Sequence, residues 1–161
     1  MKDLKGLVME CVREQDALGI KYSRNITWKV SSAYIRKWGQ CKRKPDGTCE
    51  ITIALRLLDD SVSDEAVKTT IHHELLHSVK ECSGHGEMWK RYAAKLNRRY
   101  GYNIKRTSDN EEKGVEMPEA KYIVKCEKCG AEIGRYKMSR LIEDTKYYRC
   151  TCGGRTSVFH V

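Results

Sequence analysis

The sequence has no long hydrophobic run, and this excludes a membrane-spanning helix. Its apolar stretches are short and interrupted by charged residues, whereas a helix needs about 18 consecutive apolar residues to cross a bilayer. The amino-terminal stretch carries acidic residues and lacks a clean apolar core and a small-residue cleavage site, so it does not read as a secretory signal. Internal repeats and low-complexity tracts are also missing. We therefore expect no membrane partner and a cytoplasmic location, at the nucleoid or in the nucleus if the protein acts on DNA.

The composition is that of a small, basic globular protein. The 161 residues suffice for one ordinary domain with a small satellite. Lysine and arginine number 31 against 22 acidic residues, a net charge of +9, which favours a polyanionic partner. Eight cysteines would suit a disulfide scaffold, but in a reducing compartment they indicate metal binding instead.

The hydrophobic pattern predicts an α+β domain over residues 1–105. Apolar residues recur at helical spacing from Leu4 to Leu18, and they alternate as in strands over 26–30 and 50–55. Residues 33–38 are a further candidate strand. The turn-forming run 44–48 would join it to the strand that follows as a hairpin.

Two more helices and a small second domain complete the expected order. Ser63 is placed to cap a helix that runs to Val79, and a further helix starts near Trp89 and stops at Gly101. The polar stretch 106–120 is expected to be a linker. Residues 121–161 are short, aromatic and cysteine-rich, with nine lysines and arginines against four acids.

The run His73-Glu74-Leu75-Leu76-His77 is the most informative motif of the chain. Positions i and i+4 share one face of a helix, so both imidazoles can reach one ion, and neutral nitrogen ligands suit zinc. Glu74 would lie beside that zinc as the general base of a metalloprotease, taking a proton from a zinc-activated water. The alternative is a surface helix that merely carries two histidines.

A third zinc ligand follows the helix. His85 lies between Gly84 and Gly86, where glycine allows the backbone to bring an imidazole back to the metal. His72 points about 100° away from His73 around the helix and is expected to support the site or lie on the surface. His160 is isolated and expected to be structural.

These motifs resemble the SprT-like (Spartan-type) zinc metalloprotease family. The likeness rests on the HExxH run, on Gly84-His85-Gly86 with Trp89 three residues further on, and on Trp38-Gly39-Gln40-Cys41 before the strand 51–55. It implies a small zincin-type metalloprotease domain, zinc held by His73, His77 and His85 with Glu74 as base, and cleavage of DNA-bound or DNA-crosslinked proteins. It also implies the carboxy-terminal zinc ribbon that many members carry.

The strand near Ile51 and Trp89 have expected roles in that site. Zinc proteases commonly bind an extended substrate by strand addition, so the strand near Ile51 either pairs with substrate or only packs on the helix. Trp89 is expected to pack behind His85 and fix its loop.

Two cysteine pairs predict a structural zinc site in the second domain. Cys126 and Cys129 form a CxxC pair, and Cys150 and Cys152 form a shorter CxC pair. Together they would hold one structural zinc besides the catalytic one, and the metal would supply much of the folding energy of so small a segment. His160 replacing one thiolate, a degenerate site and redox-active thiols are the alternatives.

The four remaining cysteines are not expected to bind the structural zinc. Cys11 is expected to be plain core. Cys41 and Cys49 flank the turn and could approach each other, as a disulfide or a third metal site.

Basic residues interleaved with tyrosines predict binding to DNA, single-stranded and without sequence preference. Charged runs are also common on solvated helix faces. The candidate contacts are Lys90, Arg91, Lys95, Arg98, Arg99, Arg135, Lys137, Arg140, Tyr147 and Arg149.

Two other functions fit the same motifs. One is a non-catalytic, nucleic-acid-binding zinc protein whose histidine site is closed by a fourth protein ligand such as Cys82. The other is a regulatory peptidase with a dedicated protein substrate and no need for DNA.

Overall fold

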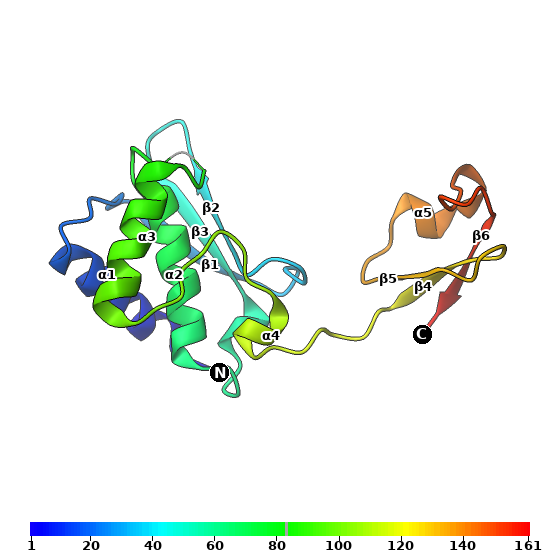
Figure 1. Ribbon diagram of the computed structural model, residues 1–161, viewed down its shortest axis with the longest axis horizontal. Helices are drawn as coiled ribbons and strands as arrows, with labels where there is room; N and C mark the ends of the chain where they lie inside the picture. The colour runs from blue at the N-terminus through cyan, green and yellow to red at the C-terminus, as the bar shows by residue number, and fades with distance from the viewer. Residues whose placement is uncertain (83) are drawn as a thin grey trace. The chain divides into compact units, whose positions relative to one another are not determined.

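The computed structural model describes residues 1–82 and 84–161, which divide into two compact units, Met1–Glu116 and Met117–Val161 (Figure 1). Both mix helices with small sheets, so the α+β class is confirmed. None of the helices in the described ranges is long and apolar enough to span a bilayer.

The first unit packs helices against one three-stranded sheet. In that sheet β3 lies between β1, to which it is parallel, and β2, to which it is antiparallel. Helix α2 contacts β2 and β3 on one side and α1 and α3 on the other. The elements are α1 (Leu4–Ala17), β1 (Ile26–Ser31), β2 (Gly39–Arg43), β3 (Cys49–Ala54), η1 (Leu55–Leu58), α2 (Asp64–Ser78), α3 (Glu87–Tyr100) and α4 (Asn110–Lys113).

Local chemistry sets the ends of α2 and α3 as the sequence predicts. The Ser63 hydroxyl accepts a hydrogen bond from the Ala66 N–H, and Asp64 and Glu65 place negative charge in the first turn of α2. Helix α3 ends at Gly101, whose φ of 76° is a left-handed conformation that favours glycine.

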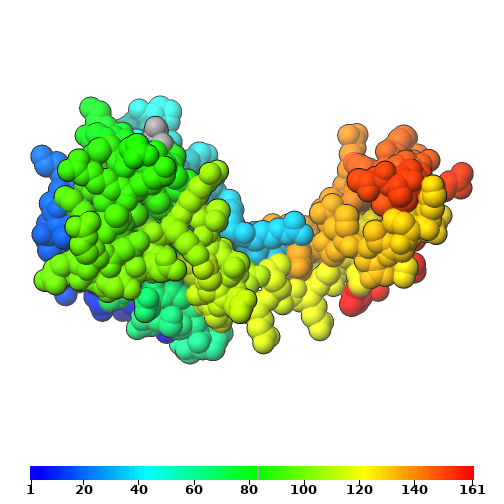
Figure 2. All heavy atoms as spheres, in the orientation of Figure 1, coloured from blue at the N-terminus to red at the C-terminus, as the bar shows by residue number. Residues whose placement is uncertain are grey.

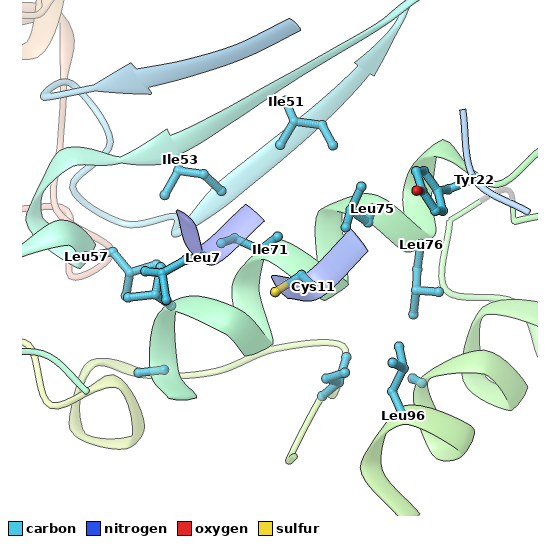
Figure 3. Close-up of a cluster of buried hydrophobic side chains, with 14 of the residues drawn as sticks. Leu7, Cys11, Tyr22, Ile51, Ile53, Leu57, Ile71, Leu75, Leu76 and Leu96 are labelled. Atoms are coloured by element: carbon cyan, nitrogen blue, oxygen red, sulfur yellow. The ribbon is translucent and has the colours of Figure 1, made fainter. Parts of the chain in front are cut away.

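The core lies between the sheet and α2. Figure 3 shows Ile51 and Ile53 of β3 facing Ile71 and Leu75 of α2, with Leu96 of α3 on the far side of the helix. All five side chains are fully buried. Since α2 is enclosed from both sides, it also buries polar side chains, Glu74 among them, and these form the site described below.

The hairpin is present, but its first strand differs from the prediction. Residues 33–38 form an irregular segment with bends and no strand, and β2 begins at Gly39. The turn at 44–48 is confirmed, with the Lys44 N–H donating to the Thr48 carbonyl at 2.9 Å. The strand near Ile51 is paired on both sides, so it has no free backbone edge for a substrate. Strand addition to it is therefore excluded, and β2 is the edge strand next to α2.

Most of the stretch expected as a linker belongs to the first unit. Figure 2 shows the yellow-green spheres that follow α3 packed on the rest of this unit. The Trp38 indole donates to the Ser108 carbonyl at 3.1 Å, and the Lys113 amine at the end of α4 is buried against α2. The polar composition concealed these anchors, and the division between the units falls after Glu116.

The second unit is a small antiparallel sheet with a helical excursion. Its strand order is β5-β4-β6. Of the first cysteine pair, Cys126 ends β4 and Cys129 lies in the turn after it, and the second pair, Cys150 and Cys152, lies before β6. The elements are β4 (Tyr122–Cys126), β5 (Glu132–Arg135), α5 (Arg140–Glu143), η2 (Thr145–Tyr147) and β6 (Thr156–His160).

Candidate metal centre

Three imidazoles converge at the carboxyl end of α2. The Nε2 atom of His77 lies 3.2 Å from those of His73 and His85, and the latter two are 3.0 Å apart. Nitrogen atoms bound to one tetrahedral zinc stand about 3.3 Å apart, because each bond is about 2.0–2.1 Å. The three predicted ligands thus occupy three corners of a zinc-sized site.

Hydrogen bonding and burial prepare these nitrogens for a metal. The His73 Nδ1 atom lies 3.1 Å from the Lys105 carbonyl, which can only accept, so Nδ1 carries the proton and the Nε2 lone pair is free. Burial and the neighbouring imidazoles lower the pKa of His73 to about 3 and that of His77 to about 4. Both rings are therefore neutral at pH 7, the form that binds zinc.

Glu74 lies beside the three imidazoles in a nearly closed environment. Its side chain is 5% exposed and lines the same cavity as His73, His77 and His85. Burial raises the pKa of this carboxyl to about 7, although a hydrogen bond from the Cys41 backbone and the charge of Lys37 act in the opposite sense. A bound divalent cation would lower the pKa again, so Glu74 can accept a proton near neutral pH.

Trp89 packs against the whole histidine set, as predicted for His85. Its ring centroid lies 4.7 Å from that of His85 and 4.9 Å from that of His73, both edge-on, and 6.0 Å from that of His77. Since Trp89 is itself buried on α3, it holds the rings in place from behind.

Arg43 is a part of the site that the sequence analysis missed. From β2 its guanidinium donates to the His77 carbonyl at 2.6 and 2.9 Å and to the Cys82 carbonyl at 3.0 Å. It also donates to the carbonyls of Val79 and Lys80. These carbonyls lie at the end of α2 and at the start of the loop to His85. The Arg43 cation therefore caps the helix that carries His73 and His77 and also holds the loop that leads to His85. An arginine in a hairpin gives no sequence signal for this role.

The fourth position of the histidine site is open among the described residues. No further His, Cys, Asp or Glu ligand atom joins the group of three there. Cys82 lines the same cavity as the three histidines, but its sulfur does not join their group. The hypothesis of a non-catalytic zinc protein requires a fourth protein ligand, whereas a catalytic zinc keeps one position for water or substrate.

His72 lies on the buried face of α2 and supports the site, which is one of the two roles predicted for it; the other was a surface position. It is fully buried, its Nε2 lies 2.8 Å from Glu14 Oε2, and its Nδ1 lies 3.2 Å from Gln15 Nε2. Cys11, Glu14 and His72 also lie close enough to hold an ion. However, the Glu14 carboxylate already accepts a bifurcated hydrogen bond from the Tyr102 hydroxyl, so its oxygens tie α1 to α2 through His72 and to the segment after α3 through Tyr102.

The four cysteines of the second unit form a compact cluster. Their sulfur atoms all lie within 4.8 Å of one another, with Cys126 and Cys152 at 3.5 Å and Cys129 and Cys150 at 3.6 Å. Sulfurs on one tetrahedral zinc stand about 3.8 Å apart, since each bond is about 2.3 Å. All four cysteines thus fit one zinc, and His160 instead packs edge-on against Tyr122 at 4.8 Å.

Cys41 and Cys49 are neighbours on adjacent strands, and both are free thiols. Burial, first of all, and then the nearby Cys49 raise the pKa of Cys41 to about 12. Neither joins a metal group among the described residues.

The candidate DNA contacts lie on both units and are largely exposed. All five on α3 are exposed. In the second unit Tyr147 is 76% exposed and lies under the Lys146 amine at 4.8 Å. Lys137, Arg140 and Arg149 are exposed and Arg135 is half-buried.

The first unit is a zinc metalloprotease-like domain. It combines a three-stranded sheet, a helix that carries two of three converging histidines, and a buried glutamate that lines the same cavity. The model of the SprT-like family matches residues 9–109, which cover α1 to the segment after α3. The chain belongs to the SprT-like family. The comparison with curated proteins gives no match.

Proposed function

We propose that the chain is a zinc-dependent endopeptidase that cleaves proteins bound or crosslinked to DNA. The observation that carries the peptidase activity is the position of Glu74 beside three imidazole nitrogens that converge at zinc distances. A zinc held by His73, His77 and His85 would act as a Lewis acid toward a peptide carbonyl and toward water.

Residues of this chain would transfer the proton and bind the substrate. Glu74 accepts the proton of the attacking water and delivers it to the leaving amine, so no net proton is consumed. The Trp38 carbonyl accepts from the Ala54 N–H at 2.8 Å. Because backbone groups alternate along a strand, those of Gly39 and Cys41 face the opposite edge of β2, where no strand of the described ranges pairs. That edge suits an extended peptide, bound by main-chain hydrogen bonds that ignore side-chain identity.

Charge and exposed aromatic surface support DNA as the targeting partner. The basic residues of α3 are exposed, and the second unit combines exposed cations with Tyr147. Cations contact phosphates of any sequence, and aromatic rings stack on any base. Such binding predicts single-stranded DNA without sequence preference and a steep loss of affinity with salt.

Cleavage of a DNA-bound basic protein tests the proposal. Zinc-loaded wild type and Glu74→Gln are compared with and without single-stranded DNA. We expect cleavage by the wild type alone and only with DNA, while both proteins retain two equivalents of zinc. Cleavage by Glu74→Gln would refute Glu74 as the base.

Two further results would point to the other functions. Cleavage that ignores DNA, and that survives Arg140→Gln with Arg149→Gln, would indicate a peptidase with a dedicated substrate. No cleavage of any protein by the zinc-loaded chain, together with DNA binding, would indicate a non-catalytic binding protein.

A further inference from the structure

A second cavity, of about 220 Å³, adjoins the metal centre and extends from it toward the amino-terminal end of α2. His73 and Glu74 form one end of its wall, and Thr69 and Thr70, one turn earlier on α2, continue it. The segment after α3 closes the opposite side. The volume is below the roughly 300–1,000 Å³ of pockets that take whole small molecules, so it suits one side chain.

The cavity is lined by a buried amine that lacks a counterion. Lys113 is 5% exposed, and its Nζ donates to Thr69 Oγ1 at 2.6 Å and to the Ala66 carbonyl at 3.1 Å. An ammonium group has three N–H bonds to donate. Among the described residues, the partners of this amine are that hydroxyl and that carbonyl, and no carboxylate pairs with it. A buried charge without a partner is costly, so an anion that entered the cavity would be bound strongly.

Two acidic side chains, Glu112 and Glu65, act on Lys113 through their charge, but neither forms an ion pair with it. Glu112 precedes Lys113 on α4, but one of its oxygens pairs with Lys105 and the other accepts from the Asp109 N–H at 3.3 Å. Arg36, Lys37 and Arg106 add three cations to the cavity wall besides the Lys105 that pairs with Glu112, while Glu74 is the one acidic residue among the described residues that line it. The cavity is therefore strongly positive.

We propose that this cavity is a substrate subsite that takes an acidic side chain next to the scissile bond, with Lys113 as its specificity-determining residue. The inference rests on the proposed peptidase function, because the cavity shares His73 and Glu74 with the metal centre. A glutamate side chain of the substrate would reach the Lys113 amine from a backbone bound beside Glu74. The subsite thus selects which peptide bond of a substrate protein is cut.

A DNA phosphate is the other anion that a positive cavity could attract. A phosphodiester carries a sugar on both sides, which a cavity of about 220 Å³ cannot admit together with the phosphate. A carboxylate at the end of a flexible arm can reach a buried amine. The size and the buried position of Lys113 thus favour an acidic side chain.

Matched peptides test the subsite. We would map one bond that the zinc-loaded full chain cuts, then place Glu, Gln or Lys at each residue flanking that bond and measure kcat/KM. At one flanking position we expect the Glu peptide to be cut about 10- to 100-fold faster than the Gln peptide, the range for a charge-assisted hydrogen bond. Lys113→Met should reduce this ratio to about 1, because the Glu peptide loses its partner.

Controls separate the subsite from folding and from catalysis. Lys42→Met removes an exposed lysine of β2 and should leave the ratio unchanged. If Lys113→Met does not fold, Lys113→Gln replaces it. Equal rates for Glu and Gln peptides at both positions would overturn the subsite and leave the peptidase standing.

If no peptide is cut, that result contradicts the proposed peptidase function, and a binding measurement then tests the subsite separately. Zinc-loaded Glu74→Gln is titrated by calorimetry with alanine hexapeptides carrying one central Glu or Gln. Tighter binding of the Glu peptide, lost in Glu74→Gln with Lys113→Met, supports the subsite, and equal binding overturns it. Displacement of the Glu peptide by a thymidine decanucleotide that depends on Lys113 would assign the cavity to phosphate and also overturn it.

Discussion

Gly39 lies so close to Glu74 that a β-carbon at position 39 would stand 2.7 Å from both Cγ and Oε1 of that carboxylate. Real β-carbons essentially never approach other atoms so closely. The glycine of β2 therefore lets the expected general base lie flat against the edge strand, where the Cys41 backbone N–H also holds it.

Replacement of Gly39 by alanine should disable Glu74 without removing zinc. The added methyl group forces the carboxylate away from the strand, and a displacement of about 1 Å can cost about 100-fold in rate. We expect Gly39→Ala to lose proteolysis to about that extent and to bind zinc normally. Lys42→Ala, on the same strand but exposed, is the control. Wild-type activity in Gly39→Ala would show that the geometry of Glu74 does not limit the reaction.

Loss of Arg43 should weaken zinc binding at the histidine site. Its guanidinium holds the carbonyls at the end of α2 and the start of the loop to His85, and supporting residues of this kind are worth about 10- to 100-fold in metal affinity. We expect Arg43→Gln to lower zinc affinity in that range by chelator competition and Arg43→Lys to recover part of it. A Co²⁺-substituted sample should show an altered d–d spectrum for Arg43→Gln, which a general loss of stability would not produce.

Disruption of the cysteine cluster should unfold the second unit alone. That unit has a small core, so bound metal would supply much of its folding energy. In Cys150→Ser we expect one equivalent of zinc to be lost and the amide resonances of residues 117–161 to collapse toward random-coil positions. Resonances of residues 1–116 should keep their dispersion. Collapse of both sets would show that the units do not fold independently.

Lys113 should make stability depend on pH in the alkaline range. Burial lowers the pKa of Lys113 from 10.5 to about 8; the charge of Lys105 acts in the same sense, and the charges of Glu112 and Glu65 act in the opposite sense. Between these values the unfolded chain binds more protons than the folded chain, so the free energy of unfolding rises with pH. The wild type should therefore gain up to about 3 kcal/mol relative to Lys113→Met from pH 8 to 10.5. Chemical denaturation at pH 7.5 and 9.5 checks this, and a constant difference would contradict a depressed pKa.

Much of the fold follows from local patterns. The helical periodicities, the Ser63 cap and the turn at 44–48 each act over a few residues, and all are present in the structure. The prediction of a strand at 33–38 was wrong. Pairing with β3 defines β2, and the hydrophobic pattern of one segment does not contain this contact between two segments. The linker failed for a similar reason, since Lys113 is buried only because α2 lies beside it.

The donor set follows from the order of residues alone: two histidines one helical turn apart, a third between glycines, and two cysteine pairs. Spacing on a helix is a local property, so these ligands can be read from the chain. The surroundings of these ligands come from long-range contacts, because burial and counterions depend on segments far apart in sequence. The approach of Gly39 to Glu74, the Arg43 contacts at the end of α2 and the unpaired Lys113 amine all arise in this way.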